Sequence, residues 1–113
     1  MELRLPQTIS FHEAGILAIS HAPKELTLEL ENVTLDDGPH NVTVWFGGVR
    51  EIKCDGVLVS DFHRVYDDGE VLSFEHGGDA VRIIIEWTDF GLHRSQTKSY
   101  VVICESLAAT IRA

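Results

Sequence analysis

Residues 80–90 read AVRIIIEWTDF, and their apolar side chains recur at every second position. Val81, Ile83, Ile85 and Trp87 alternate with Arg82, Ile84, Glu86 and Thr88. A period of two places successive side chains on opposite faces of a β-strand. This stretch therefore predicts a strand with one well-buried face.

The same alternation continues on both sides of this stretch. In ELTLELE (25–31) three leucines alternate with threonine and glutamate, and NVTVWF (41–46) repeats the pattern. Residues 100–104, YVVIC, are apolar at every position, as expected for a strand near the centre of a sheet. The odd positions of SLAATIRA (106–113) also alternate, so a strand is preferred there over a short helix that the alanines favour.

Turn sequences separate these runs. They are HAPKE (21–25), LDDGPHN (35–41), FGG (46–48), YDDGE (66–70), HGGD (76–79) and DFGLHRSQ (89–96). Asp-Gly and Gly-Gly supply the positive φ angles that tight hairpins need. The spacing predicts one all-β domain over residues 1–113: an antiparallel meander of seven to nine strands that forms a sandwich or a barrel-like curved sheet.

The segment SFHEAGILAISH (10–21) mixes two signals. Ser10 and Glu13 match the S-x-x-E capping box of a helix start, whereas Gly15 and Pro23 limit any helix to a few turns. We therefore expect a single helical turn at 10–14, followed by a strand from about Gly15 to Ser20 that pairs with the leucine strand.

The chain has 113 residues and a formal net charge of −9. Proteins bind phosphate backbones through Lys and Arg, so this charge disfavours nucleic acid and anionic membranes. The partner that the charge would attract is cationic: a basic protein, a metal ion or a basic peptide. Solubility alone also explains the charge.

No secretory signal pattern or membrane-spanning apolar run occurs, and we expect a cytoplasmic protein. Cys54 and Cys104 are fifty residues apart with no CxxC pair, which favours reduced, buried thiols over the alternative of a strand-to-strand disulfide. No cofactor motif is present, and none is predicted.

His12, Glu13 and His21 are the first candidates for a site. A zinc-protease H-E-x-x-H motif needs a histidine four residues after His12, where Ile16 stands. No metal site is therefore predicted, and a turn is the preferred role for His12 and Glu13.

Glu86 and Trp87 are the second candidates. A carboxyl between apolar neighbours could lie in an apolar cleft with a raised pKa, as a catalytic acid does. The structural alternative is that Glu86 shares its face with Arg82 and Thr88 and is satisfied by a cross-strand ion pair. No G-x-S-x-G elbow occurs, and Cys54 has only Lys53 and Asp55 beside it. The acidic clusters at 36–37 and 67–70 lack the EF-hand pattern and are interpreted as hairpin turns.

Three segments carry a resemblance: FHEAGIL (11–17), the leucine strand 26–30 and IIIEW (83–87). Together they resemble small bacterial β-proteins of the F-H-[DE]-A-x-I-L type, some of which are classed as immunity proteins of polymorphic toxin systems. The resemblance covers about a third of the chain. It implies a cytoplasmic, all-β, non-enzymatic protein that binds a partner, and it implies no functional residue.

Three functions follow as hypotheses. The first is a non-catalytic protein-binding module, such as an immunity-type inhibitor of a basic toxin. The second is a small enzyme or ligand-binding β-barrel with a pocket lined by Trp45, Trp87, Tyr100 and a convergent Glu or His. The third is a homo-oligomer, for example a homodimer, that joins exposed sheet edges.

Overall fold

The computed structural model describes residues 2–3, 11–35 and 37–111, and the described part contains strands and turns but no helix. The strands are β1 (Glu2–Leu3), β2 (Gly15–Ala22), β3 (Glu25–Leu35), β4 (Gly38–Gly47), β5 (Glu51–Cys54), β6 (Val57–Val59), β7 (Asp68–Gly77), β8 (Ala80–Asp89), β9 (Arg94–Ile103) and β10 (Ser106–Ile111). The all-β prediction is confirmed. Apart from the two-residue β1, nine strands are described, the upper end of the predicted range.

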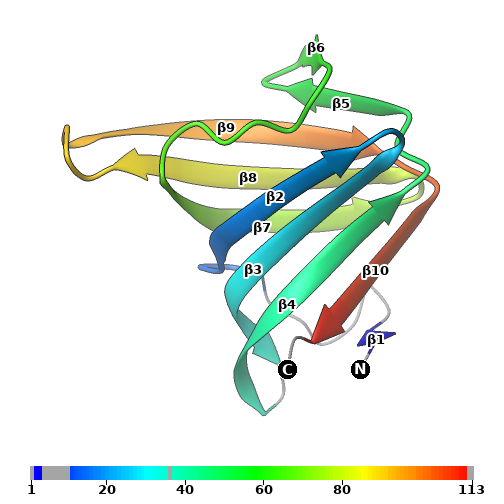
Figure 1. Ribbon diagram of the computed structural model, residues 1–113, viewed down its shortest axis with the longest axis horizontal. Coiled ribbons are helices and arrows are strands. Elements are labelled where there is room, and N and C mark those ends of the chain that lie inside the picture. The colour runs from blue at the N-terminus through cyan, green and yellow to red at the C-terminus, as the bar shows by residue number, and fades with distance from the viewer. Residues whose placement is uncertain (1, 4–10, 36, 112–113) are drawn as a thin grey trace.

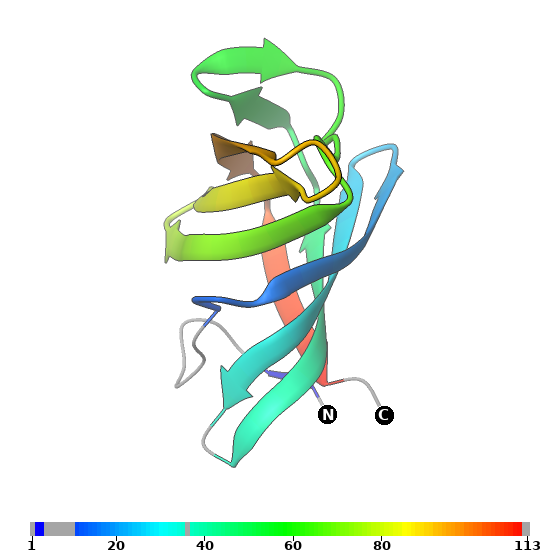
Figure 2. The same cartoon turned by 90° about the vertical axis from the view of Figure 1, so that its left-hand side faces the viewer.

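The strands form one antiparallel sheet in the order β1-β10-β4-β3-β2-β7-β8-β9-β5-β6. The sheet is not closed into a barrel (Figure 1). It consists of two halves, β1-β10-β4-β3-β2 and β7-β8-β9-β5-β6, which meet at β2 and β7. At this seam the ladder between β2 and β7 consists of a single residue pair, Gly15 opposite Glu70. Beyond it the strands diverge, and Figure 2 shows β7, β8 and β9 crossing in front of the steeper β3 and β4. The result is a strongly curved sheet folded over its own core.

Apolar side chains from both halves form this core. Fully buried leucines of β3 pack with the isoleucines of β8, and Phe46 of β4 lies 6.5 Å, ring centre to ring centre, from Phe74 of β7. No polar or charged residue is buried among the described residues. The alternation in the sequence thus identifies the inner face correctly, because burial of apolar area is the main force that holds the halves together.

The predicted helical turn at 10–14 is wrong over the part of it that the structure describes, residues 11–14. Ala14 N donates a 3.0 Å hydrogen bond to Phe11 O, which closes a β-turn, and Glu13 has a φ of 68°. That positive φ is incompatible with a helix start, so Glu13 does not act as a capping-box residue. Ser10 lies outside the described residues. The strand expected after the turn is confirmed as β2, which pairs with β3.

The C-terminal segment is the strand β10 as far as Ile111, as predicted, while residues 112–113 lie outside the described part. Two other features differ from expectation. Asp68, Gly69 and Glu70 belong to β7 rather than to a hairpin turn. The hairpin of β5 and β6 was not predicted, although Asp55-Gly56 is a strong turn signal with φ values of 51° and 82°.

The loop 60–67 between β6 and β7 covers the inner face of β8 and β9. Phe62 is buried and stacks on Tyr100 at 4.1 Å between ring centres. Arg64 Nη2 donates a 3.1 Å hydrogen bond to Leu17 O, at a bulge of β2 beside the seam. The loop therefore connects the two halves where their strands no longer pair.

Candidate functional site

His12 lies in the turn before β2 and docks that turn onto β7. Its Nδ1 donates a 2.9 Å hydrogen bond to Leu72 O, while Glu13 N donates a 2.7 Å bond to Val71 O. Leu72 lies at a bulge of β7, where the register with β8 shifts. Its carbonyl is therefore available to accept this bond. His12 and Glu13 thus have a structural role, in agreement with the preferred interpretation of the sequence.

His21 is far from this turn, at the other end of β2. Its Nδ1 lies 3.3 Å from Asp61 Oδ1, and Asp61 Oδ2 lies 3.6 Å from His63 Nε2. The structure therefore does not bring His12 and His21 together. In the described ranges, no group of three His, Cys, Asp or Glu side chains could hold a metal ion.

Trp87 is fully buried and belongs to the core. Its Nε1 donates a 2.8 Å hydrogen bond to the hydroxyl of Tyr100, and the Arg64 guanidinium lies 5.6 Å from its ring centre. Burial raises the pKa of Tyr100 to about 12. Trp45 lies on the opposite face of its sheet half and is 37% exposed. The three aromatic side chains therefore do not line a common pocket, contrary to the second hypothesis.

Cys54 does not have the environment of a nucleophile. Burial and the nearby Asp55 carboxylate raise the pKa of its thiol, so the reactive thiolate is disfavoured. Cys54 and Cys104 are both free thiols, as predicted; Cys104 is buried, but Cys54 is only half-buried.

Glu86 points to the outer face of β8, the face of Arg82 and Thr88, as the strand alternation predicts. The expected cross-strand ion pair is wrong, because the residue opposite Glu86 on β7 is Glu70 and the one on β9 is Thr97. Side chains opposite each other on antiparallel strands have Cβ atoms about 5 Å apart. Two carboxylates are therefore neighbours on this face.

A third glutamate extends this row across the seam. Gly15 pairs with Glu70 on one side and with Glu31 on the other. A Cβ atom placed on Gly15 would lie 3.0 Å from Glu31 Oε1, so the Glu31 side chain leans over the glycine toward Glu70. We call Glu31, Glu70 and Glu86 the acidic ladder. Within the described part of the chain, none of the three makes an ion pair with a basic side chain.

The acidic ladder borders a hollow on the outer face of β7, β8 and β9, here called the outer trough. It has a volume of about 560 Å³ and is lined by Asp68, Glu70, Glu86, Thr88, Phe90, His93, Arg94 and Ser95. Phe90, in the β8–β9 turn, is 70% exposed. The outer trough thus combines the carboxylates of Asp68, Glu70 and Glu86 with one exposed aromatic ring and one guanidinium, that of Arg94.

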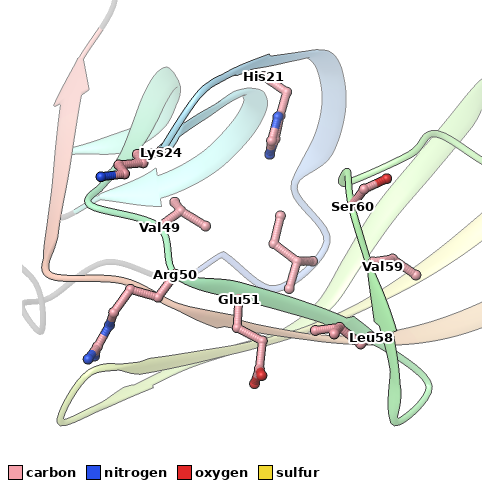
Figure 3. A pocket seen from close by; sticks show the side chains of 9 residues that line it. His21, Lys24, Val49, Arg50, Glu51, Leu58, Val59 and Ser60 are labelled. Carbon is pink, nitrogen blue, oxygen red and sulfur yellow. The ribbon is translucent and has the colours of Figure 1, made fainter.

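A second hollow, the corner hollow, lies between the β2–β3 turn, the start of β5 and β6. It has a volume of about 320 Å³. Figure 3 shows the His21 ring and the Val49 side chain directed into it, whereas the Lys24 and Arg50 side chains are directed away from it. Both hollows are open at the surface, and Trp45, Trp87 and Tyr100 line neither of them.

Of the sequence candidates, Glu86 lines the outer trough and His21 lines the corner hollow. Their neighbours Glu31, Glu70 and Lys24 were missed, because strand alternation assigns a face but not the neighbouring strand. Gly15 could have indicated the acidic ladder, because it has no side chain to separate Glu31 from Glu70. This requires knowing that β2 lies between β3 and β7.

No helix long and apolar enough to cross a bilayer occurs among the residues that the structure describes. Comparisons of the chain with protein-family models, with curated proteins and with solved structures find no match.

Proposed function

We propose that this chain is a non-catalytic protein-binding module whose acidic ladder receives a basic partner protein. The observation that carries the proposal is the position of Glu70 directly opposite Glu86, with Glu31 leaning toward them across Gly15. Like charges at directly opposite positions of a sheet destabilise the free protein. A cationic side chain that enters between them removes this repulsion, so the surface is complementary to a cation.

The outer trough adds shape and apolar area to this charge. An arginine side chain can place its guanidinium between Glu70 and Glu86 and its planar face against Phe90. The net charge of −9 also accelerates the encounter with a basic partner through long-range attraction. Aromatic rings surrounded by polar groups are frequent binding anchors in protein interfaces.

The specific form that we propose is a cytoplasmic immunity-type inhibitor, which would block a basic toxin by covering its cationic surface. The sequence resemblance supports a protein that binds a partner, and the acidic ladder supports a basic one. An inhibitor of this kind acts by steric and electrostatic masking, which requires no catalytic group.

Differential affinity capture tests this function. The wild-type chain, the Glu70→Gln/Glu86→Gln variant and a charge-matched Glu25→Gln/Glu105→Gln control are each immobilised and exposed to a lysate of the source cell. We expect a basic protein to be captured by the wild type and the control but not by the ladder variant. A basic protein captured equally by all three baits would show that the ladder is not the binding surface, and the absence of any such protein would contradict the proposed function.

A second candidate function, self-association, is favoured by β6. This strand forms one edge of the sheet, and Val57 and Leu58 are each 64% exposed. Exposed apolar edge strands can pair with another copy. Light scattering at high protein concentration separates the two candidates: a monomer supports the binding module, and a dimer that the Leu58→Lys variant dissociates supports self-association.

A further inference from the structure

Part of one edge of β9 lies open beside the acidic ladder. β5 pairs with β9 only from Tyr100 to Ile103, so residues 94–98 have β8 on one side and no strand of the described residues on the other. Figure 1 shows β5 and β6 beside the C-terminal part of β9 alone. Ser95 and Thr97, in the open part, are both exposed. This edge is therefore accessible to another strand.

The backbone groups of Ser95 and Thr97 point to this open edge. Ser99 O accepts a 2.7 Å hydrogen bond from Asp55 N, and Ser99 N donates a 2.8 Å bond to Asp55 Oδ1, both on the side of β9 away from β8. Successive residues of a strand in an antiparallel sheet direct their backbone groups to opposite edges. Thr97 and Ser95, two and four residues before Ser99, therefore direct their N–H and C=O groups to the same side as Ser99.

Thr97 continues the row of residues that contains the acidic ladder. It is opposite Glu86, and Glu86 is opposite Glu70. A residue of an added strand opposite Thr97 would lie two strand spacings from Glu86, about 10 Å. Extended arginine and glutamate side chains together span this distance, across the short side chain of Thr97. The open edge therefore places a cationic side chain of a partner strand at the acidic ladder.

The inner face of the same edge disfavours basic side chains. Lys98 is opposite the buried Ile85 and so points to the inner face, as does Arg94. Lys98 Nζ lies 3.3 Å from Asp55 Oδ2, and the Arg94 guanidinium lies 5.5 Å from the Tyr66 ring centre. Like charges at opposite positions of a sheet repel each other. A partner strand should therefore carry its basic residues on the outer face only, that is, at every second position.

We propose that the basic partner adds an extended segment to the open edge of β9, with arginine or lysine at every second position. The segment runs antiparallel to β9, as β5 and β8 do, and its backbone bonds to Ser95 and Thr97. Strand addition of this kind takes affinity from main-chain hydrogen bonds and specificity from alternate side chains. The inference rests on the proposed function, because it states how the partner of the acidic ladder is held.

Matched peptides test strand addition by amide NMR of the full chain. The first is a short capped peptide in which arginine and threonine alternate; the second is N-methylated at its arginines and the third at its threonines. In the proposed geometry the arginine N–H groups face β9 and the threonine N–H groups face away. We expect the first and third peptides to shift the Ser95 and Thr97 signals and to slow their hydrogen exchange, and the second to bind about tenfold more weakly. Equal binding of the two methylated peptides, or the reverse preference, would overturn the proposal.

Two proline variants locate the added strand. Thr97→Pro removes an outward N–H that bonds no residue in the described part of the chain, and edge strands tolerate proline at such a position. Leu58→Pro is the control, because by the same alternation the Leu58 N–H points to the free edge of β6. Thr97→Pro should bind the first peptide about tenfold more weakly, and Leu58→Pro should bind it like the wild type. Loss of affinity in Leu58→Pro alone would overturn the proposal, and if Thr97→Pro does not fold, the methylated peptides decide.

The same spectra separate this inference from the proposed function. Binding that shifts Glu70 and Glu86 but does not depend on where the peptide is methylated would overturn strand addition and leave the acidic ladder as the binding surface. A peptide that shifts none of Glu70, Glu86 and Thr97 would overturn both.

Discussion

Trp87 and Tyr100 are joined by a 2.8 Å hydrogen bond from the indole Nε1 to the phenolic oxygen, in the interior of the curved sheet. Both side chains are almost completely buried, and the loop residue Phe62 covers the tyrosine ring. The hydrogen bond therefore gives a partner to the Trp87 N–H and to the Tyr100 hydroxyl, as polar groups buried in an apolar core require. Because both rings are buried in the core, they do not line a ligand pocket.

Replacing Tyr100 by phenylalanine should destabilise the fold. The substitution keeps the ring but leaves the Trp87 indole N–H buried without an acceptor, which costs about 1–3 kcal/mol of the free energy of unfolding. Urea denaturation followed by tryptophan fluorescence measures this. A variant as stable as the wild type would mean that the hydrogen bond makes no net contribution.

The stability should fall in alkaline solution because of the same hydroxyl. The folded protein has a Tyr100 pKa of about 12, whereas an unfolded tyrosine has a pKa of about 10. Between these values the folded state retains a proton that the unfolded state has lost. The contribution of this hydroxyl to stability is therefore complete below about pH 10 and is lost as the pH rises through 12, by about 3 kcal/mol in total. Denaturation at a series of pH values should show this decrease in the wild type. Tyr100→Phe should show a flatter profile, and parallel profiles would contradict the assignment.

Gly69 should not tolerate a side chain, because its Cβ position is occupied. A Cβ atom there would lie 2.5 Å from a ring carbon of Trp87, whereas one on Gly77, at the other end of the same strand, would meet nothing within 4 Å. Gly69→Ala should therefore cost about 1–3 kcal/mol of stability, and Gly77→Ala should cost little or nothing. Thermal denaturation compares the two variants. Equal melting temperatures would contradict the packing of Trp87 on β7.

Removing one charge of the acidic ladder should stabilise the free protein. Glu86→Gln keeps the shape of the side chain but ends the repulsion with Glu70, and a gain of about 0.2–1 kcal/mol is expected. Salt screens surface charges, so the gain should shrink at high ionic strength. The control is Glu105→Gln, away from the ladder. A loss of stability in Glu86→Gln would indicate that a cation of the protein itself already satisfies Glu86.

Much of the fold could be predicted from local sequence because strand alternation and turn residues act over short distances. The burial of Val81, Ile83, Ile85 and Trp87 follows from their period of two alone. The first turn was mistaken because Ser10 and Glu13 match a helix cap by spacing, while the bonds to Leu72 and Val71 that fix the turn come from a strand sixty residues away in the chain.

The candidate sites were less predictable because they depend on which strands become neighbours. Glu31 and Glu86 are brought into one row only by the single pair that joins Gly15 to Glu70. Lys24 looked like an ordinary turn residue, and its relation to Val49 and Ile52 arises from the folding of β5 against the β2–β3 turn. Contacts of this kind are set by tertiary packing rather than by local pattern.

Titration with a short arginine-rich peptide, followed by amide NMR, tests the central claim that the acidic ladder is the surface for a basic partner. We expect the largest shifts at Gly15, Glu70, Glu86 and Thr97. The affinity should fall about tenfold in Glu70→Gln/Glu86→Gln but not in the charge-matched Glu25→Gln/Glu105→Gln control. Shifts scattered over all faces, with an equal loss of affinity in both variants, would show that only the net charge attracts the peptide and would contradict the account.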